Sequence, residues 1–197
     1  MAESDLKKVN VRILPNYGFL ETTIPDELFQ KLLFESKYAE LKNPEMISGI
    51  TATDVAKHKY VIDSKKELID YVQHLVNIYN SHFSLLESYK ILTENLPFYF
   101  NKPWFNFQRK GEYVPYHTHD GIYAYSLWLK IPKKCQFEFH YTNIIGNMQQ
   151  HKIELTKKDE GKIIFFPSTL PHVAYPFNGS QGVRISVSGN VSLNSNG

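Results

Sequence analysis

The chain has 197 residues, enough for one domain or for one domain with a small helical lobe. Its net charge of +2 is too small to indicate binding to nucleic acid or to an anionic membrane, so we expect neither partner. The single cysteine, Cys135, excludes an intrachain disulfide framework. With no signal peptide or membrane helix in the pattern, we expect an intracellular protein.

The first half of the chain carries one strand pattern and two helix patterns. Residues 9–14 alternate apolar and polar side chains, which predicts a strand. A proline followed by two acids predicts a helix that begins near residue 25 and passes through residue 33. A longer helix is predicted from about Ser64 to Phe83, where Ser64 and Glu67 have the spacing of a capping box. We expect both helices to pack on one face of a sheet.

After residue 97 the spacing of apolar side chains changes from helical to period two. Seven or eight short strands separated by turn residues are typical of a sandwich or a jelly roll. We therefore predict one domain over 1–197, in which 97–191 form a jelly-roll core and 1–96 form a helical buttress with edge strands. The predicted strands cover residues 104–109, 113–119, 122–131, 136–142, 151–155, 162–166, 172–175 and 183–191.

Three histidines form the main candidate site. His117 and His119 are two residues apart, so on a strand their side chains leave the same face, and His172 follows on a later strand. Imidazoles suit iron, zinc, copper or nickel. The usual non-haem iron triad has two histidines and a carboxylate. Two ligand sets are therefore open: all three histidines, or a set in which Asp120 replaces one of them.

A polar face follows on the last predicted strand. Arg184, Ser186, Ser188 and Asn190 alternate with apolar residues and share one side. An interior arginine needs an anion to offset its desolvation, and the distal carboxylate of 2-oxoglutarate fits a guanidinium fork. Arg184 would make the paired contact and Ser186 one more hydrogen bond. A metal beside such a clamp favours an oxygenase that uses iron and a 2-oxo acid.

Four segments together resemble a known family: KGEYVPYHTHDG at 110–121, FEFHYTN at 137–143, FFPS at 165–168 followed by PH at 171–172, and RISVSGN at 184–190. They resemble the iron/2-oxoglutarate oxygenases common in phages of marine cyanobacteria, which look like distant relatives of the prolyl hydroxylases. The resemblance covers nearly the whole chain and is best from Trp104 to Val191. It departs from the His-x-Asp form of prolyl hydroxylases at His119.

This resemblance implies a double-stranded β-helix, also called a cupin-like jelly roll, with Fe(II) as cofactor and 2-oxoglutarate and dioxygen as co-substrates. It implies metal roles for His117, His119 and His172, and a 2-oxoglutarate role for Arg184 with Ser186. It also implies the cytoplasm of an infected bacterial host. His140 is expected to be an exposed non-ligand. Six side chains are candidates for the cavity mouth, and strand parity alone does not say which side each faces: Trp104, Asn106, Tyr116, Tyr123, Tyr125 and Trp128.

The substrate is open at this point. Hydroxylation of a prolyl residue is an expectation by analogy with the relatives, and a small metabolite or nucleobase is the alternative. Two other readings also stand beside the oxygenase: a cupin-like metal-binding or structural protein without oxo-acid turnover, and a three-histidine dioxygenase that uses no 2-oxoglutarate.

Overall fold

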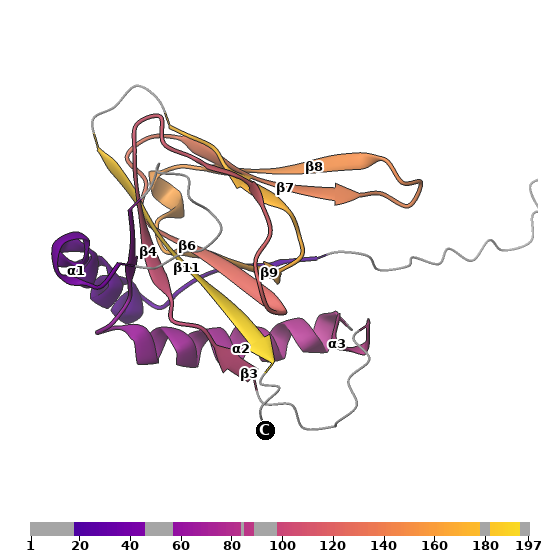
Figure 1. The fold of residues 1–197 in the computed structure, drawn as a ribbon, viewed down its shortest axis with the longest axis horizontal. Coiled ribbons are helices and arrows are strands. Elements are labelled where there is room, and N and C mark those ends of the chain that lie inside the picture. The colour runs from indigo at the N-terminus through magenta and orange to yellow at the C-terminus, as the bar shows by residue number, and fades with distance from the viewer. Residues whose placement is uncertain (1–17, 46–56, 84, 89–97, 178–181, 194–197) are drawn as a thin grey trace, which may run out of the picture.

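The computed structural model describes residues 18–45, 57–83, 85–88, 98–177 and 182–193. Two β-sheets face one another, and helices cover the outer face of the larger sheet (Figure 1). The predicted strand at residues 9–14 lies outside the described residues. Within them, no helix is long and apolar enough to span a membrane.

The larger sheet has seven strands within the described part of the chain, in the order β1-β9-β6-β11-β4-β2, and β3 pairs with β11. Its long central strands, β6 and β11, pair antiparallel over most of their length. These strands are β1 (Leu20–Thr23), β2 (Lys57–Tyr60), β3 (Phe98–Phe100), β4 (Trp104–Arg109), β6 (Tyr123–Lys130), β9 (Lys162–Pro167) and β11 (Val183–Leu193).

The smaller sheet has four strands within the described residues, in the order β5-β10-β7-β8. They are β5 (Val114–His117), β10 (His172–Ala174), β7 (Cys135–Thr142) and β8 (Met148–Leu155). Two facing antiparallel sheets confirm the predicted jelly roll. The sequence pattern did not predict the edge strands β1, β2 and β3, and it extended β5 two residues too far, to His119.

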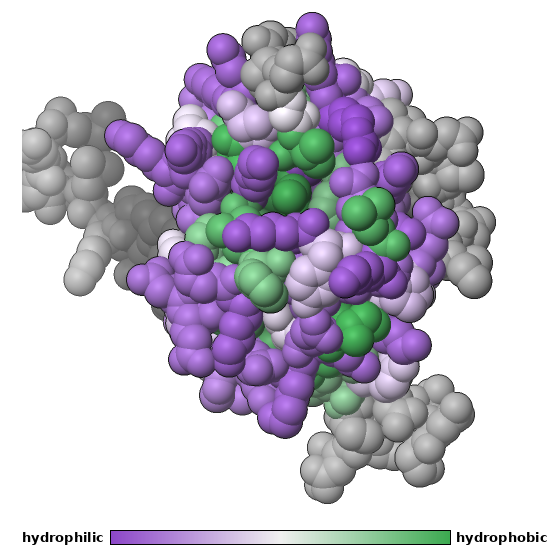
Figure 2. All heavy atoms as spheres, turned by 90° about the vertical axis from the view of Figure 1, so that its left-hand side faces the viewer, coloured by the Kyte–Doolittle hydropathy of each residue, from purple (hydrophilic) through white to green (hydrophobic). Residues whose placement is uncertain are grey.

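The helices lie where the pattern expects them. They are α1 (Asp26–Lys42), α2 (Lys65–His82) and the short α3 (Leu85–Ser88), with a 3-10 turn at Lys157–Asp159. Leu32 of α1 and Val72 of α2 pack in one cluster with Phe105 and Leu127 of the larger sheet. The two long helices therefore cover one face of that sheet (Figure 1). Hydrophilic side chains predominate on the side of the molecule that carries α1, and the apolar ones there are separated (Figure 2).

The predicted capping box at the start of α2 is wrong. The Ser64 side chain makes no capping hydrogen bond, although Ser64 is the N-cap residue. The buried carboxylate of Glu35 on α1 accepts the backbone N–H groups of Ile62 and Ser64 instead, over 2.7 and 2.9 Å. The Glu35 carboxylate thus accepts the Ser64 backbone N–H, the donor that the Glu67 side chain would accept in a capping box.

Strand alternation separates the helix-side core from the interior between the sheets. On β6, Tyr123, Tyr125 and Leu127 join the cluster that packs on the helices, whereas Ala124 and Trp128 join the cluster between the sheets. On β11, Ile185 and Val187 face the helices in the same way. The polar residues that alternate with them therefore face the smaller sheet, where the candidate site lies.

Candidate metal centre

Three imidazoles come together between the sheets. The ligand nitrogens of His117, His119 and His172 lie within 4.8 Å of one another, and the Nε2 atoms of His119 and His172 are 3.2 Å apart. Two nitrogens about 2.1 Å from one ion have this separation when they subtend roughly 100° at the ion. That angle suits neighbouring coordination positions. The side chains converge as the sequence pattern predicts, while their role as metal ligands stays a prediction.

Strand pairing and one anchored loop build this cluster. His172 on β10 lies opposite His117 on β5 in the antiparallel ladder. His119 follows β5, and its backbone N–H donates to Ser168 O over 2.9 Å. Gly121 has a φ of +89°, and a Cβ there would lie 2.6 Å from Val191 O, so only glycine fits. Both constraints fix the short loop that carries His119.

Backbone carbonyls set the tautomers of two of the histidines. Nδ1 of His117 lies 2.7 Å from Pro115 O, and Nδ1 of His172 lies 2.9 Å from Leu170 O. A carbonyl only accepts, so in each ring Nδ1 donates its hydrogen and Nε2 keeps a free lone pair. Such carbonyl contacts commonly orient histidine ligands in metal sites. The donor set therefore fits a divalent metal ion.

Burial keeps the cluster uncharged. Desolvation lowers the pKa of His117, and it lowers the pKa of His119 to about 3. The pKa of His172 falls well below its ordinary value, first through burial and then through its two imidazole neighbours. Part of that burial comes from the Phe137 ring, which stacks on His172 at a centroid distance of 5.1 Å. Metals bind the neutral form of imidazole, so these three histidines would release few protons when a metal ion binds.

A cavity of about 690 Å³ adjoins the triad, a size typical of small-ligand sites. All three histidines line it, together with Trp104, Asn106 and Trp128, three of the six candidates for the mouth. The other three candidates are not among the lining residues. Tyr123 and Tyr125 lie in the helix-side core, and Tyr116 packs its ring edge-on against His140.

Asp120 lies apart from the three converging nitrogens. It is exposed and lines the cavity, but the cluster of possible metal ligands among the described residues contains only the histidines. The geometry therefore favours the all-histidine set over the set with Asp120.

Arg184 lies in the interior, as the alternation of β11 predicts, and is 1% exposed. Its Nε and Nη2 donate to Gln108 Oε1 over 2.9 and 2.8 Å, and its Nη1 donates to Tyr175 O over 2.8 Å. Gln108 and Ser186 line the cavity, whereas Arg184, which donates to Gln108, is not among the lining residues. Ser186 Oγ accepts from Asn106 Nδ2 over 3.2 Å, which leaves its own hydrogen to donate.

Sequence reasoning missed Gln108 and Phe137. Gln108 lies opposite Arg184 in the ladder between β4 and β11, and Phe137 lies on β7, which pairs with β10. Both residues were visible as inward positions of predicted strands. Only the strand register, which a single sequence does not give, puts them beside Arg184 and His172.

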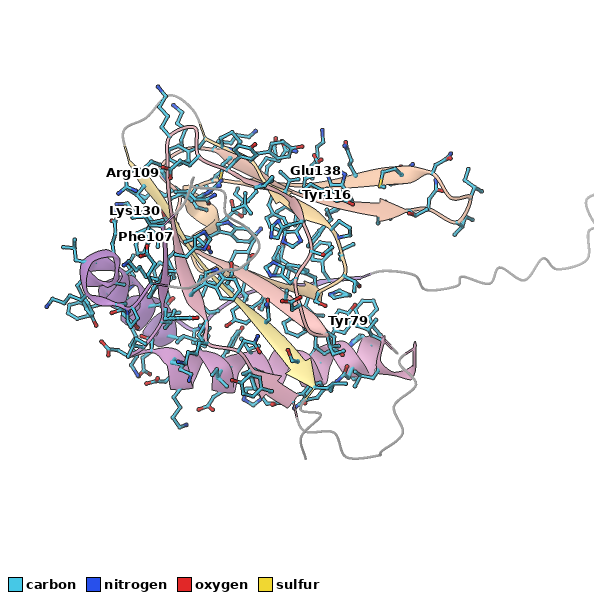
Figure 3. The ribbon with its side chains drawn as sticks, viewed as in Figure 1. Tyr79, Phe107, Arg109, Tyr116, Lys130 and Glu138 are labelled. Atoms are coloured by element: carbon cyan, nitrogen blue, oxygen red, sulfur yellow. The ribbon has the colours of Figure 1, made fainter. Side chains whose placement is uncertain are left out.

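His140 belongs to a separate polar cluster on the smaller sheet. Its Nε2 lies 2.9 Å from the buried carboxylate of Glu138, which also accepts from Tyr175 Oη over 3.2 Å. Figure 3 shows Glu138 and Tyr116 on the part of the smaller sheet that lies away from the helices. The expectation of an exposed His140 is wrong, because its side chain is only 15% exposed. Its absence from the cavity lining agrees with a non-ligand.

Comparisons with known proteins agree with this fold. Residues 102–190 match the family model described as "Putative 2OG-Fe(II) oxygenase". No curated protein sequence matches the chain. Among solved structures, a Pseudomonas putida prolyl-4-hydroxylase is similar, with 15% identity, a TM-score of 0.62, and coverage of 88% of this chain and 91% of that one.

Two further structures share the fold. The viral collagen prolyl hydroxylase from Paramecium Bursaria Chlorella virus-1, in complex with 2OG, has 15% identity and a TM-score of 0.54 over 88% of this chain and 94% of its own. HygX from Streptomyces hygroscopicus, with nickel, 2-oxoglutarate and hygromycin B bound, has 10% identity and a TM-score of 0.56 over 89% and 83%. The fold is the double-stranded β-helix. The family match over residues 102–190 supports an oxidoreductase, and iron and 2-oxoglutarate are the cofactors to which that match points.

Proposed function

We propose that the protein is an Fe(II)/2-oxoglutarate-dependent hydroxylase whose metal is held by His117, His119 and His172. The observation that carries this proposal is the convergence of three neutral imidazoles on the wall of a cavity. The carbonyl contacts that leave Nε2 free on His117 and His172 support it further. When bound, iron with 2-oxoglutarate and dioxygen supplies the oxidation that converts a C–H bond to C–OH while the oxo acid becomes succinate and CO₂.

The chain's own residues have three tasks in this reaction. Arg184 supplies the positive charge that attracts the distal carboxylate of the oxo acid, and Ser186 adds a hydrogen bond from the cavity wall. Trp104 is only 6% exposed and lines the cavity near His119, at a ring-centroid distance of 6.2 Å. Its apolar ring would limit the access of water to the space beside the three histidines.

The substrate we propose is a prolyl residue of a polypeptide. The prolyl hydroxylases among the structural neighbours support this class, and so do the aromatic side chains of Tyr60, Tyr99 and Trp104 in the cavity lining, because aromatic rings are suited to proline. Phage origin and the cytoplasm of an infected bacterium are part of the same proposal.

The test is succinate formation from 2-oxoglutarate by the Fe(II)-loaded protein in air, followed by mass spectrometry of proline-containing peptides. We expect wild-type protein to form succinate and add one oxygen atom to a peptide. The variant His172→Ala should form none, and His74→Ala, which removes an exposed imidazole from α2, should match wild type. Oxo acid that remains unconsumed by the iron-loaded wild-type protein would contradict the proposal.

A three-histidine dioxygenase that uses no oxo acid is the second candidate. Its supporting observation is His119, which stands where the usual non-haem iron triad has an acid. Oxygen consumption by the Fe(II)-loaded protein without 2-oxoglutarate would favour it. Oxygen consumption that depends on 2-oxoglutarate favours the hydroxylase.

A further inference from the structure

A buried arginine and glutamine form a pair beside the cavity. Arg184 and Gln108 are each 1% exposed and lie opposite one another on β11 and β4. Two guanidinium N–H groups of Arg184 converge on Gln108 Oε1. Gln108, unlike Arg184, lines the cavity, so the amide stands between the guanidinium and the space that a ligand would fill.

The arginine fixes which way this amide points. If the amide were turned over, its NH₂ group would face two N–H donors, so Oε1 must face Arg184. Gln108 Nε2 is then directed away from Arg184, and it is buried without a hydrogen-bond partner among the described residues. A buried donor without a partner is unfavourable, because it has lost its hydrogen bond to water and gained none in the protein. The neighbouring amide of Asn106 contrasts with it, because its Nδ2 donates to both Ser186 and Ser188.

The charge of Arg184 also lacks a counter-charge. Its partners are an amide oxygen, the backbone carbonyl of Tyr175 and the ring of Phe177, with Cζ 6.0 Å from the ring centroid. Within the residues that the structure describes, no carboxylate forms an ion pair with it. A buried cation without an anion is unfavourable, and so is a buried donor without an acceptor. One ligand carboxylate in the cavity would satisfy both.

We propose that Gln108 and Arg184 form one carboxylate-binding unit, in which Gln108 Nε2 donates directly to the ligand carboxylate and Arg184 supplies the charge behind it. Gln108 is the contact residue of this unit, and its orientation is set by Arg184. That the carboxylate is the distal one of 2-oxoglutarate rests on the proposed function. The unit itself rests only on the buried pair and its unused donor.

The substitution Gln108→Glu tests the unit most sharply, because it keeps the shape of the side chain. The introduced carboxylate would accept both Arg184 donors and neutralise the guanidinium inside the protein, so folding should be preserved. It would also remove the Nε2 donor and repel a ligand anion. We expect the affinity for glutarate and for 2-oxoglutarate to fall about a hundredfold, since a charge-assisted hydrogen bond and an attraction are both lost.

Two further variants complete the set. Gln108→Met keeps the length and removes the donor without adding charge, so we expect about a tenfold loss of affinity. Gln150→Glu makes the same chemical change as Gln108→Glu on the exposed face of β8, so it should bind as wild type does.

The experiment is calorimetric titration of metal-free and Zn(II)-loaded full-length protein with glutarate and with 2-oxoglutarate. In parallel, the side-chain amide resonance of Gln108, identified by its loss in Gln108→Met, is followed by NMR. The proposal expects that resonance to shift with glutarate and not with 2-oxobutanoate, which lacks the distal carboxylate. This readout in wild-type protein decides the question even if Gln108→Glu fails to fold.

Unchanged affinity in folded Gln108→Glu or Gln108→Met would overturn the unit, and so would wild-type protein that binds neither dicarboxylate. A Gln108 amide resonance whose chemical shift does not change when glutarate is added would overturn the proposed unit as well. Dicarboxylate binding that depends on Gln108, without any succinate formation, would leave the unit standing and refute the proposed hydroxylase instead.

Discussion

The substitution His119→Gln should reduce the acid sensitivity of the metal-free protein. Burial lowers the pKa of His119 from 6.5 to about 3 in the folded protein. Above pH 6.5 the side chain is neutral in both the folded and the unfolded state and adds no pH dependence. Below it, the unfolded chain takes up a proton that the folded protein does not, so stability falls as the pH drops from 6.5 toward 3.

The size of this effect follows from the two pKa values. Between pH 7.5 and pH 4.5, linkage gives a loss of about 2.5 kcal/mol from His119, and the figure barely changes if the folded pKa is 4 rather than 3. His117 and His172 add to the loss in wild-type protein, because burial lowers their pKa as well. The difference between wild type and His119→Gln isolates the contribution of His119.

The assay is urea unfolding of chelator-treated protein at several pH values, followed by circular dichroism. The advantage in the free energy of unfolding that wild type has over His119→Gln at pH 7.5 should shrink by about 2.5 kcal/mol at pH 4.5. His74→Gln, the same change at an exposed position of α2, measures the effect of removing a surface imidazole. A difference between wild type and His119→Gln that stays constant over this range would refute the account of a neutral, buried His119.

Three further predictions follow from individual contacts. Glu35→Ala should lower the free energy of unfolding by about 3–5 kcal/mol, because buried backbone donors lose their acceptor, while zinc affinity measured by competition with a chelator stays unchanged. Phe137→Ala should cost about 3–5 kcal/mol in urea unfolding and also weaken zinc binding, since the ring stacks on His172. Arg184→Lys should weaken 2-oxoglutarate binding in calorimetry at least tenfold, because an ammonium cannot reproduce the pair of N–H donors that a guanidinium directs to Gln108 Oε1. Equal affinity would contradict the role of Arg184 in carboxylate binding.

The sequence predicted the jelly-roll core well because its signals are local. The period-two pattern gave β4 with its observed bounds and β6, β7 and β9 within one residue at each end. Alternation along β11 also predicted that Arg184 and Ser186 face inward. The edge strand β2 was missed because its sequence, KHKY, has no alternation of apolar and polar residues.

The arrangement of the site was only partly predictable, because it depends on contacts between distant segments. The spacing of His117 and His119 predicted a shared face, but the second histidine reaches the triad through a loop held by Ser168. The pattern on β11 predicted that Arg184 needs an anion, but not that Gln108 stands between it and the cavity. Nothing in the alternation of β4 indicates which strand it pairs with.

X-ray absorption spectroscopy of the cobalt-loaded protein tests the central claim most directly. The claim is that three imidazoles hold the metal and that Asp120 does not. The account predicts scattering from three imidazoles per metal, with nitrogens at about 2.0–2.2 Å, an unchanged spectrum in Asp120→Ala, and loss of tight binding in His172→Ala. Two imidazoles with a carboxylate signal that disappears in Asp120→Ala would contradict it.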